Sequence, residues 1–228
     1  MSIPIPSGTS TATLIRISLN VHSTNVRRDL AHPDGLHKTI MTLAPDGLDE
    51  TPRLSAGLLF RLDDATHHAP PTLLVQSLLP PDLARLPRNY GSTETRDLTP
   101  LLTALTAGRR VRYRITANAT VRRRADDNPH RRTDVALHGD DALTWWHRKA
   151  THAGLALDSA THTPMRRSRR PITKQHGSGR EPGHFRHALT RFDGQATITD
   201  PDRLRHAVLT GIGRGKSYGA GLLSLAPA

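Results

Sequence analysis

The sequence predicts an α+β protein of two tandem ferredoxin-like (RRM-like) βαββαβ domains, and two observations support this. The chain has 228 residues, which suits one large domain or two small ones. Strand-like and helix-like segments also follow one another in a similar order in both halves, and that order is the ferredoxin-like one. We place the first domain at 1–96, a linker at 97–108 and the second domain at 109–228.

The first domain begins with an alternating, strand-like segment and continues with a helix. Asp34 follows Pro33 and is expected to be the N-cap of that helix, and Pro45 ends it. Two further strands and a short helical turn come next, and a loop-rich stretch, Asn89 to Ala107, follows them. The predicted elements are Thr13 to Val21 (strand), Asp34 to Ala44 (helix), Arg53 to Leu62 and Thr72 to Ser77 (strands) and Pro80 to Leu86 (turn).

The second domain opens with a strand that has two different faces. Arg110, Arg112 and Arg114 alternate with apolar residues, which predicts one cationic and one buried face. Asp193-Gly194 is expected to form a turn. The later elements are Asp140 to Ala153 (helix), Met165 to His184 (irregular loop or hairpin), Leu189 to Ile198 (strand), Asp200 to Thr210 (helix) and Leu222 to Leu225 (strand).

A glycine-rich segment, residues 211–221, precedes the last strand. Its glycines surround two cations, Arg214 and Lys216, so backbone N–H groups can approach an anion closely. We expect Gly211, Gly213 and Gly215 to cradle phosphate. Thr210 occupies the place of the first glycine of a nucleotide P-loop, which excludes that motif. The alternative is that the two cations only flank the C-terminus of the preceding helix.

Positive charge is concentrated in two stretches of the chain. The formal net charge is +12, residues 109–124 contain seven arginines and no acid, and residues 162–191 contain eight Lys or Arg against one acid. Such clusters favour a nucleic-acid partner over a merely solvated basic surface. Aromatic residues make up 4% of the chain, so we expect arginines rather than stacked rings to contact the nucleic acid. The candidates are Lys38, Arg110, Arg112, Arg114, Arg166, Arg167, Arg169, Arg170, Arg214 and Lys216.

Other classes of protein and site are disfavoured. The chain has no cysteine, which excludes disulfides and thiolate metal sites. It lacks a long apolar run and a signal peptide, so we expect a soluble, cytoplasmic protein without a membrane partner. Residues 63–68 include Asp and His but fit a turn between strands better than a metal site. Asp126-Asp127 and Asp140-Asp141 fit a turn and a helix start better than paired catalytic carboxylates.

His37 is the strongest catalytic candidate. It lies towards one edge of the apolar stripe of its predicted helix, where a half-buried structural histidine is the commoner case. The functional alternative is a general base or acid, because an imidazole titrates near neutral pH. RNA cleavage by its own 2′-OH needs such proton transfer, together with cations to stabilise the developing charge.

The chain resembles the CasE (Cse3) family of CRISPR-associated endoribonucleases of the type I-E Cascade complex. The likeness includes RRDLAHPDGLHKTIMTLAP near the N-terminus, PRLSAGLLFRLD, RVRYRITANAT and the Trp145-Trp146 helix. The most specific block is FDGQATITDPDRLRHAVLTGIGRGKSYGAGLLSLAP at the end of the chain.

The resemblance implies metal-independent cleavage of precursor CRISPR RNA at the base of the repeat stem-loop. The products would carry a 2′,3′-cyclic phosphate and a 5′-OH, no cofactor would be needed, and the enzyme would stay bound to the mature RNA beside the other Cascade subunits. It also implies that His37 is catalytic. Some members have a catalytic tyrosine three positions earlier, where this chain has Asp34. The alternative is a non-catalytic subunit of the same complex that binds the RNA hairpin.

Overall fold

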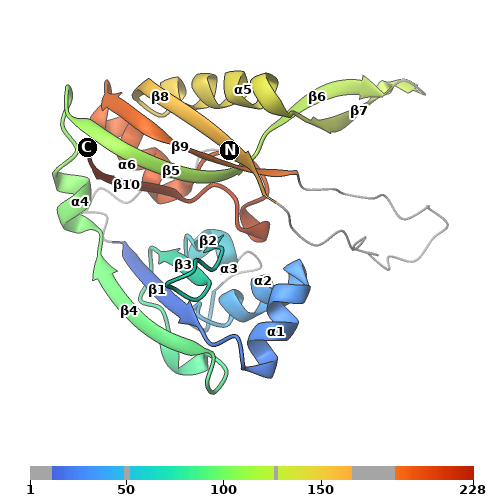
Figure 1. Ribbon diagram of the computed structural model, residues 1–228, viewed down its shortest axis with the longest axis vertical. Helices are drawn as coiled ribbons and strands as arrows, with labels where there is room; N and C mark the ends of the chain where they lie inside the picture. Colours follow the sequence, from blue (N-terminus) through green and yellow to red (C-terminus); the bar gives the residue numbers. More distant parts are fainter. Residues whose placement is uncertain (1–11, 49–51, 126–127, 166–187) are drawn as a thin grey trace.

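Two four-stranded antiparallel sheets lie one above the other in the computed structural model, which describes residues 12–48, 52–125, 128–165 and 188–228 (Figure 1). The strand order is β2-β3-β1-β4 in the first sheet and β10-β5-β9-β8 in the second. Each sheet therefore has the first and third strands of its unit at the centre, which is the ferredoxin-like arrangement. The predicted α+β fold of two tandem ferredoxin-like domains is confirmed.

The first unit contains two helices between its first two strands, where the sequence predicted one. The extra helix, α1, was missed because it buries only Val26 and Asp29. The predicted strand from Arg53 to Leu62 is also divided into a helical turn and a shorter strand. The elements are β1 (Thr13–Leu19), α1 (Thr24–Ala31), α2 (Pro33–Met41), α3 (Pro52–Ser55), β2 (Leu59–Asp63), β3 (Thr72–Ser77), η1 (Leu83–Arg85) and β4 (Gly91–Asp97).

The second unit follows the same order and carries an inserted hairpin. That hairpin, β6 and β7, comes between the first strand and helix α5, and it projects from the body of the molecule (Figure 1). The elements are β5 (Arg110–Asn118), β6 (Thr120–Ala125), β7 (Asn128–Ala136), α5 (Gly139–His152), β8 (Leu155–Pro164), β9 (Leu189–Ile198), α6 (Pro201–Thr210), η2 (Lys216–Tyr218) and β10 (Leu223–Pro227).

The expected loop from Asn89 to Ala107 is wrong, because it contains β4 and a short helix, α4 (Thr99–Thr103). Every residue of β4 is exposed, so its side chains show no alternation that a sequence pattern could reveal. Its backbone nevertheless pairs with β1 along its whole length. We keep 97–108 as the proposed connection between the two domains, with α4 in it.

The expected turn at Asp193-Gly194 is also wrong, because β9 runs straight through both residues. Glycine is needed there for close approach of the neighbouring strand. A Cβ at position 194 would lie 2.1 Å from the carbonyl oxygen of Ser159, beside the register shift between Leu157 and Ser159 in β8.

Each unit has its own hydrophobic core. Side chains of β1 and α2, such as Ile17 and Ile40, form the first core. The second is built around Trp146, whose ring lies 5.7 Å from that of Phe192 and 5.5 Å from that of Tyr113, measured between centroids. Aromatic pairs at such distances pack favourably. The two units thus bury separate apolar interiors.

Polar contacts join the two units. The side chain of Gln76 on β3 is buried and donates from Nε2 to the carbonyl oxygens of Val208 and Leu209, at 3.0 and 3.2 Å. These carbonyls belong to the last turn of α6, so the first sheet holds the point at which the glycine-rich segment begins.

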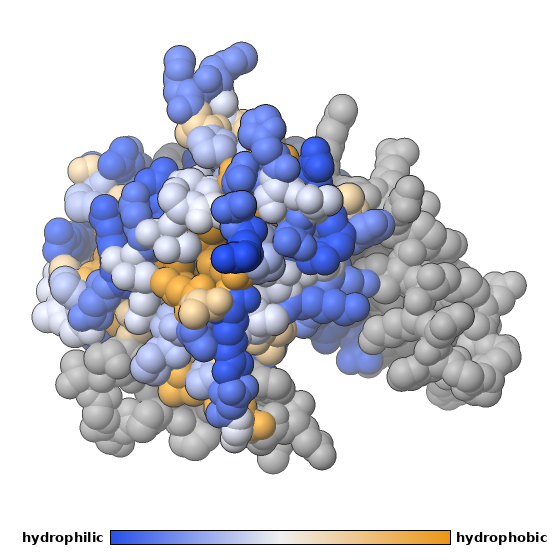
Figure 2. Space-filling model, turned by 90° about the horizontal axis from the view of Figure 1, so that it is seen from below, coloured by the Kyte–Doolittle hydropathy of each residue, from blue (hydrophilic) through white to orange (hydrophobic). Residues whose placement is uncertain are grey.

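No helix in the described part of the chain is long and apolar enough to span a membrane. Figure 2 shows a mainly hydrophilic face with a narrow apolar strip near its centre.

Candidate nucleic-acid interface and active site

Helix α2 presents His37 at its middle. The helix begins at Pro33 with His32 as its N-cap, so the expected N-cap role of Asp34 is wrong. Pro33 fits the first helical position because its missing N–H needs no partner there. Asp34 instead lies in the first turn, where a carboxylate is favourable to the helix dipole.

His37 is half-buried, and its environment favours the neutral imidazole. Burial lowers the pKa of His37, the nearby Arg53 guanidinium lowers it further, and Asp34 opposes the shift. Its Nδ1 is buried and has no hydrogen-bond partner among the residues that the structure describes. A neutral imidazole can accept a proton at neutral pH, which a general base requires.

The glycine-rich segment of the second unit packs against this helix. Its 3-10 turn η2 contacts both α2 and β2, so two motifs at opposite ends of the chain meet in space. Gly211, Gly213 and Gly215 all have positive φ, between 73° and 82°. A Cβ at Gly211 would lie 2.9 Å from the side chain of Leu59 on β2, so glycine lets the segment approach the first unit closely.

Lys216 lies in the turn that contacts α2. Its Nζ donates to the carbonyl oxygen of Thr210 at 2.7 Å, at the C-terminus of α6, which is the alternative role that the sequence left open. The lysine is also half-buried, and both burial and the Arg53 guanidinium lower its pKa. An ammonium with a lowered pKa gives up its proton more readily. Lys216 is therefore suited to proton transfer as well as to capping the helix.

Arg53 is a member of this site that the sequence did not reveal, because the pattern placed it at the start of a strand. Helix α3 instead turns it towards His37 and Lys216. Burial lowers the pKa of its guanidinium. Within the described ranges no ion pair or hydrogen bond engages this guanidinium. His37, Lys216 and Arg53 together form a half-buried, basic site suited to a phosphate.

Tyr218, at the end of η2, also faces α2. Burial raises the pKa of its phenol, and the Asp34 carboxylate raises it further. The phenol therefore stays protonated at neutral pH, where its hydroxyl can donate or accept a hydrogen bond and can act as an acid. No periodicity in the sequence marks this residue, because it lies inside the glycine-rich segment.

The cationic face of β5 is as predicted, and its arginines are already engaged. Val111 and Tyr113 are buried, while Arg110 and Arg112 on the opposite face are exposed. Arg110 bonds Asp158 and Gln195, Arg112 donates to the carbonyl of Pro227, and Arg114 pairs with Asp193. To bind phosphate as expected, these arginines would have to exchange their present protein partners for phosphate oxygens.

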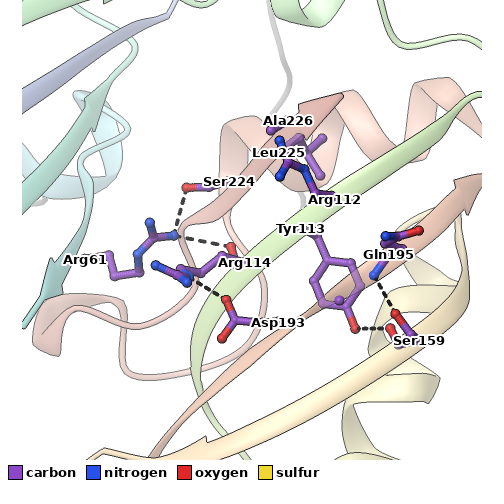
Figure 3. Close-up of a pocket in the computed structure, with 11 residues that line it drawn as sticks. Arg61, Arg112, Tyr113, Arg114, Ser159, Asp193, Gln195, Ser224, Leu225 and Ala226 are labelled. Carbon is purple, nitrogen blue, oxygen red and sulfur yellow. Dashed lines mark hydrogen bonds and ion pairs between the residues drawn. The ribbon is translucent and has the colours of Figure 1, made fainter. Parts of the chain in front are cut away.

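A pocket of about 500 Å³ lies on this same face (Figure 3). Arg61 reaches it from β2 and bonds both the Ser224 hydroxyl and the carbonyl of Arg114, at 2.8 and 3.3 Å. Arg61 also forms a bidentate pair with Asp63. Since its guanidinium is engaged on every side, it acts as a link between the two sheets rather than as a free cation.

The inserted hairpin supplies a second group of cations. Arg122, Arg123 and Arg124 of β6 are all exposed. The sequence indicated these three arginines only as part of the arginine-rich run at 109–124. Nothing in that run distinguishes them from the arginines of β5. Arg214 of the glycine-rich segment pairs with Asp134 of β7, which ties the hairpin to the glycine-rich segment.

The remaining sequence-predicted residues are Lys38, those at 63–68 and those outside the described ranges. Lys38 is exposed on α2 next to His37. Arg166, Arg167, Arg169, Arg170 and Asp126-Asp127 fall in segments that the structure does not describe. Residues 64–68 lie in the turn between β2 and β3, as expected, and Asp63 is the last residue of β2. In the described ranges no three His, Asp or Glu side chains converge as metal ligands would.

Comparison with known proteins agrees with this architecture. A family model described as CRISPR associated protein matches residues 14–227. The CRISPR-associated endoribonuclease Cse3 of Thermus thermophilus is 31% identical over 219 residues, which is 94% of this chain and 99% of that protein. This chain belongs to the CRISPR-associated Cse3 family.

Solved structures of related proteins extend over the same length. Thermus thermophilus Cse3 bound to an RNA representing a pre-cleavage complex has a TM-score of 0.74 and 28% identity, covering 95% of this chain and all of that one. A chain of a CRISPR RNA-guided surveillance complex in a pre-nicking state has 38% identity and a TM-score of 0.66, with 95% and 100% covered. The Cse3 fold therefore extends through both units.

Proposed function

We propose that this protein is a metal-independent endoribonuclease that cleaves precursor CRISPR RNA at the base of the repeat stem-loop. The observation that carries the proposal is the meeting of α2 and η2, which brings His37 to a half-buried basic site. The relatives named as a Cse3 endoribonuclease and as Cse3 bound to a pre-cleavage RNA support the choice of substrate.

The reaction needs only groups of this chain and of the RNA. The RNA 2′-oxygen attacks the adjacent phosphorus while His37 takes the 2′-OH proton, and the bond from phosphorus to the 5′-oxygen breaks. Lys216 donates a proton to that leaving oxygen, and the products carry a 2′,3′-cyclic phosphate and a 5′-OH. Lys216 and Arg53 stabilise the negative charge that develops on the phosphorane, as fixed cations at a desolvated site do.

The RNA stem is held by exposed cations around this site. Lys38 lies next to His37 on α2, and Arg214 and the glycines at 211, 213 and 215 belong to the segment that contains η2. Arg122, Arg123 and Arg124 lie on the hairpin that Asp134 ties to Arg214. We also assign a phosphate-binding role to Arg110, Arg112, Arg114, Arg166, Arg167, Arg169 and Arg170. Such contacts position the RNA through its backbone and shape. Tight product binding would keep the enzyme on the mature RNA as a subunit of Cascade, since a relative is part of a surveillance complex.

The chemistry of the product ends tests this proposal. The protein is incubated with a repeat hairpin RNA in EDTA, and the fragments are analysed for a cyclic phosphate and a free 5′-OH. We expect one cut at the base of the stem, with these ends. Intact RNA after long incubation would contradict the proposed endoribonuclease activity.

The second candidate is a non-catalytic subunit that binds the RNA hairpin. Asp34, where some family members have a catalytic tyrosine, is the observation that favours it. It predicts tight, hairpin-selective binding without cleavage at any pH. The same assay, run with a binding measurement, separates the two candidates.

A further inference from the structure

Asp29 on α1 is a buried carboxylate that the proposed reaction does not use. Only 1% of the residue is exposed. Three neighbours donate to it: Thr39 to Oδ2 at 2.5 Å, Tyr90 to Oδ2 at 2.9 Å, and Arg28 to Oδ1 at 2.9 Å. A buried carboxylate with this many donors fixes the orientation of the groups around it, because charge-assisted hydrogen bonds are short and strong.

The donors come from separate parts of the first unit. Arg28 precedes Asp29 on α1, Thr39 lies on α2, and Tyr90 comes just before β4. Burial and the Asp29 carboxylate both raise the pKa of the Tyr90 phenol, so it remains a donor at all working pH values. Asp29 thus joins α2 to the neighbouring helix and to the edge of the sheet.

The two helices also touch directly at this carboxylate. A Cβ added to Gly35 would lie 3.0 Å from Oδ1 and 3.2 Å from Cα of Asp29. Helix α2 therefore contacts Asp29 at two places one turn apart, at Gly35 and at Thr39. A helix held at two such points can neither rotate nor slide freely along its neighbour.

His37 lies on the other side of α2 from Gly35 and Thr39. At about 100° per residue, position 37 is about 200° around the axis from position 35 and from position 39. His37 shares its side of α2 with Asp34, whose carboxylate acts on the Tyr218 phenol of η2, so this side of the helix faces η2. If the hydrogen bonds to Asp29 were removed, any rotation of α2 that this allowed would move His37 relative to Lys216.

We propose that Asp29 is a positioning residue, which holds α2 through Thr39 and Tyr90 so that His37 is presented to the basic site on η2. This inference rests on the proposed function. It adds residues on α1 and before β4 to the groups on which cleavage depends. Displacement of a reacting group by about 1 Å costs up to about 100-fold in rate.

Two conservative substitutions each remove a hydrogen bond to Asp29 without leaving a cavity in the core. Thr39→Val keeps the shape of the side chain and removes its hydroxyl, and Tyr90→Phe keeps the ring. Thr39→Ser restores a hydroxyl and serves as the rescue. Tyr113→Phe is the matched control, because Tyr113 is equally buried and donates to the carbonyl of Ser159 at 3.0 Å in the second unit.

Single-turnover cleavage and hairpin binding are measured for each folded variant. We expect Thr39→Val and Tyr90→Phe to slow cleavage by about 10- to 100-fold, with the RNA Kd within about twofold of wild type. Thr39→Ser and Tyr113→Phe retain the wild-type rate. A purely structural role would lower the melting temperature and leave the cleavage rate of the folded protein unchanged, which would overturn the proposal.

The titration of His37 by NMR provides a second readout that needs no activity. Asp34 on α2 and Arg53 on α3 act on the pKa of His37, Lys38 is the exposed cation beside it, and Lys216 and Tyr218 lie on the η2 turn that contacts α2. In Thr39→Val and Tyr90→Phe, displacement of His37 from this site raises its lowered pKa towards the ordinary value. An unchanged titration would contradict the positioning role. If wild type cleaves no hairpin, the proposed function fails, and this titration still decides whether Asp29 positions His37.

Discussion

Arg61 of β2 donates from Nη1 to the hydroxyl of Ser224 on β10, at 2.8 Å. This bond, drawn in Figure 3, joins the edge strands of the two sheets. Strand β2 also contacts η2. The arginine side chain is 4% exposed and also pairs with Asp63. The position of Lys216 beside α2 therefore depends on a buried arginine that belongs to the other unit.

Arg61→Met is expected to lower the free energy of unfolding by about 3 kcal/mol, because removal of one partner leaves the Asp63 carboxylate uncompensated. It should also slow RNA cleavage, because the two units separate more easily. Chemical denaturation and single-turnover cleavage measure both effects. Arg16→Met is the control, since its pair with Glu94 is exposed and contributes about 0–1 kcal/mol. Equal stability of the two variants would contradict the linking role.

Arg53→Met is expected to shift the pH dependence of cleavage. Arg53 lowers the pKa values of His37 and Lys216, so its removal raises both. Because the base form of His37 is the deprotonated one, the rising limb of the pH–rate profile moves to higher pH. Single-turnover rates from pH 5 to 9 measure the shift.

Lys38→Met is the matched control for that shift. Lys38 is an exposed cation on the same helix as His37. Its removal should weaken hairpin binding and leave the rising limb where it is in wild type. Equal shifts in the two variants would indicate a general effect of charge rather than a specific one of Arg53.

Lys216→Met is expected to lower the single-turnover rate by about 100-fold, in the range that general acids contribute. Lys216→Arg distinguishes proton transfer from electrostatic stabilisation, because a guanidinium keeps the charge and does not release its proton. We expect the arginine variant to bind the hairpin like wild type and to cleave slowly. Full recovery of cleavage by arginine would assign Lys216 an electrostatic role alone.

Joint replacement of Arg122, Arg123 and Arg124 by Ala is expected to weaken RNA binding and reduce its salt dependence. For each arginine that pairs with a phosphate, its removal lowers the slope of log K against log salt by about one. Fluorescence anisotropy across a salt series measures this slope. Arg203→Ala is the control, because that arginine is exposed on α6 and pairs with Asp200. An unchanged slope in the triple variant would place the RNA elsewhere.

Local patterns were enough to predict the amphipathic elements. The alternation of arginines with Val111 and Tyr113 predicted β5, and the predicted α6 begins with Asp200 accepting from the N–H groups of Asp202 and Arg203. Charge and glycine content likewise marked the glycine-rich segment. These features depend on residues close in sequence, which is why a single sequence reveals them.

Elements and contacts made by distant parts of the chain were not predictable in this way. The exposed strand β4 is defined by its pairing with β1, and α1 is largely polar. The places of Arg53 and Tyr218 in the site depend on how the second unit docks on the first. No periodicity encodes that docking, so the sequence pointed to His37 and Lys216 separately, without a sign that they meet.

The rate of hairpin cleavage by His37→Ala in EDTA tests the central claim most directly. If His37 is the base at the junction of α2 and η2, this variant binds the repeat hairpin with the wild-type Kd and cleaves it at least about 100-fold more slowly. Cleavage at the wild-type rate by the variant would contradict the account.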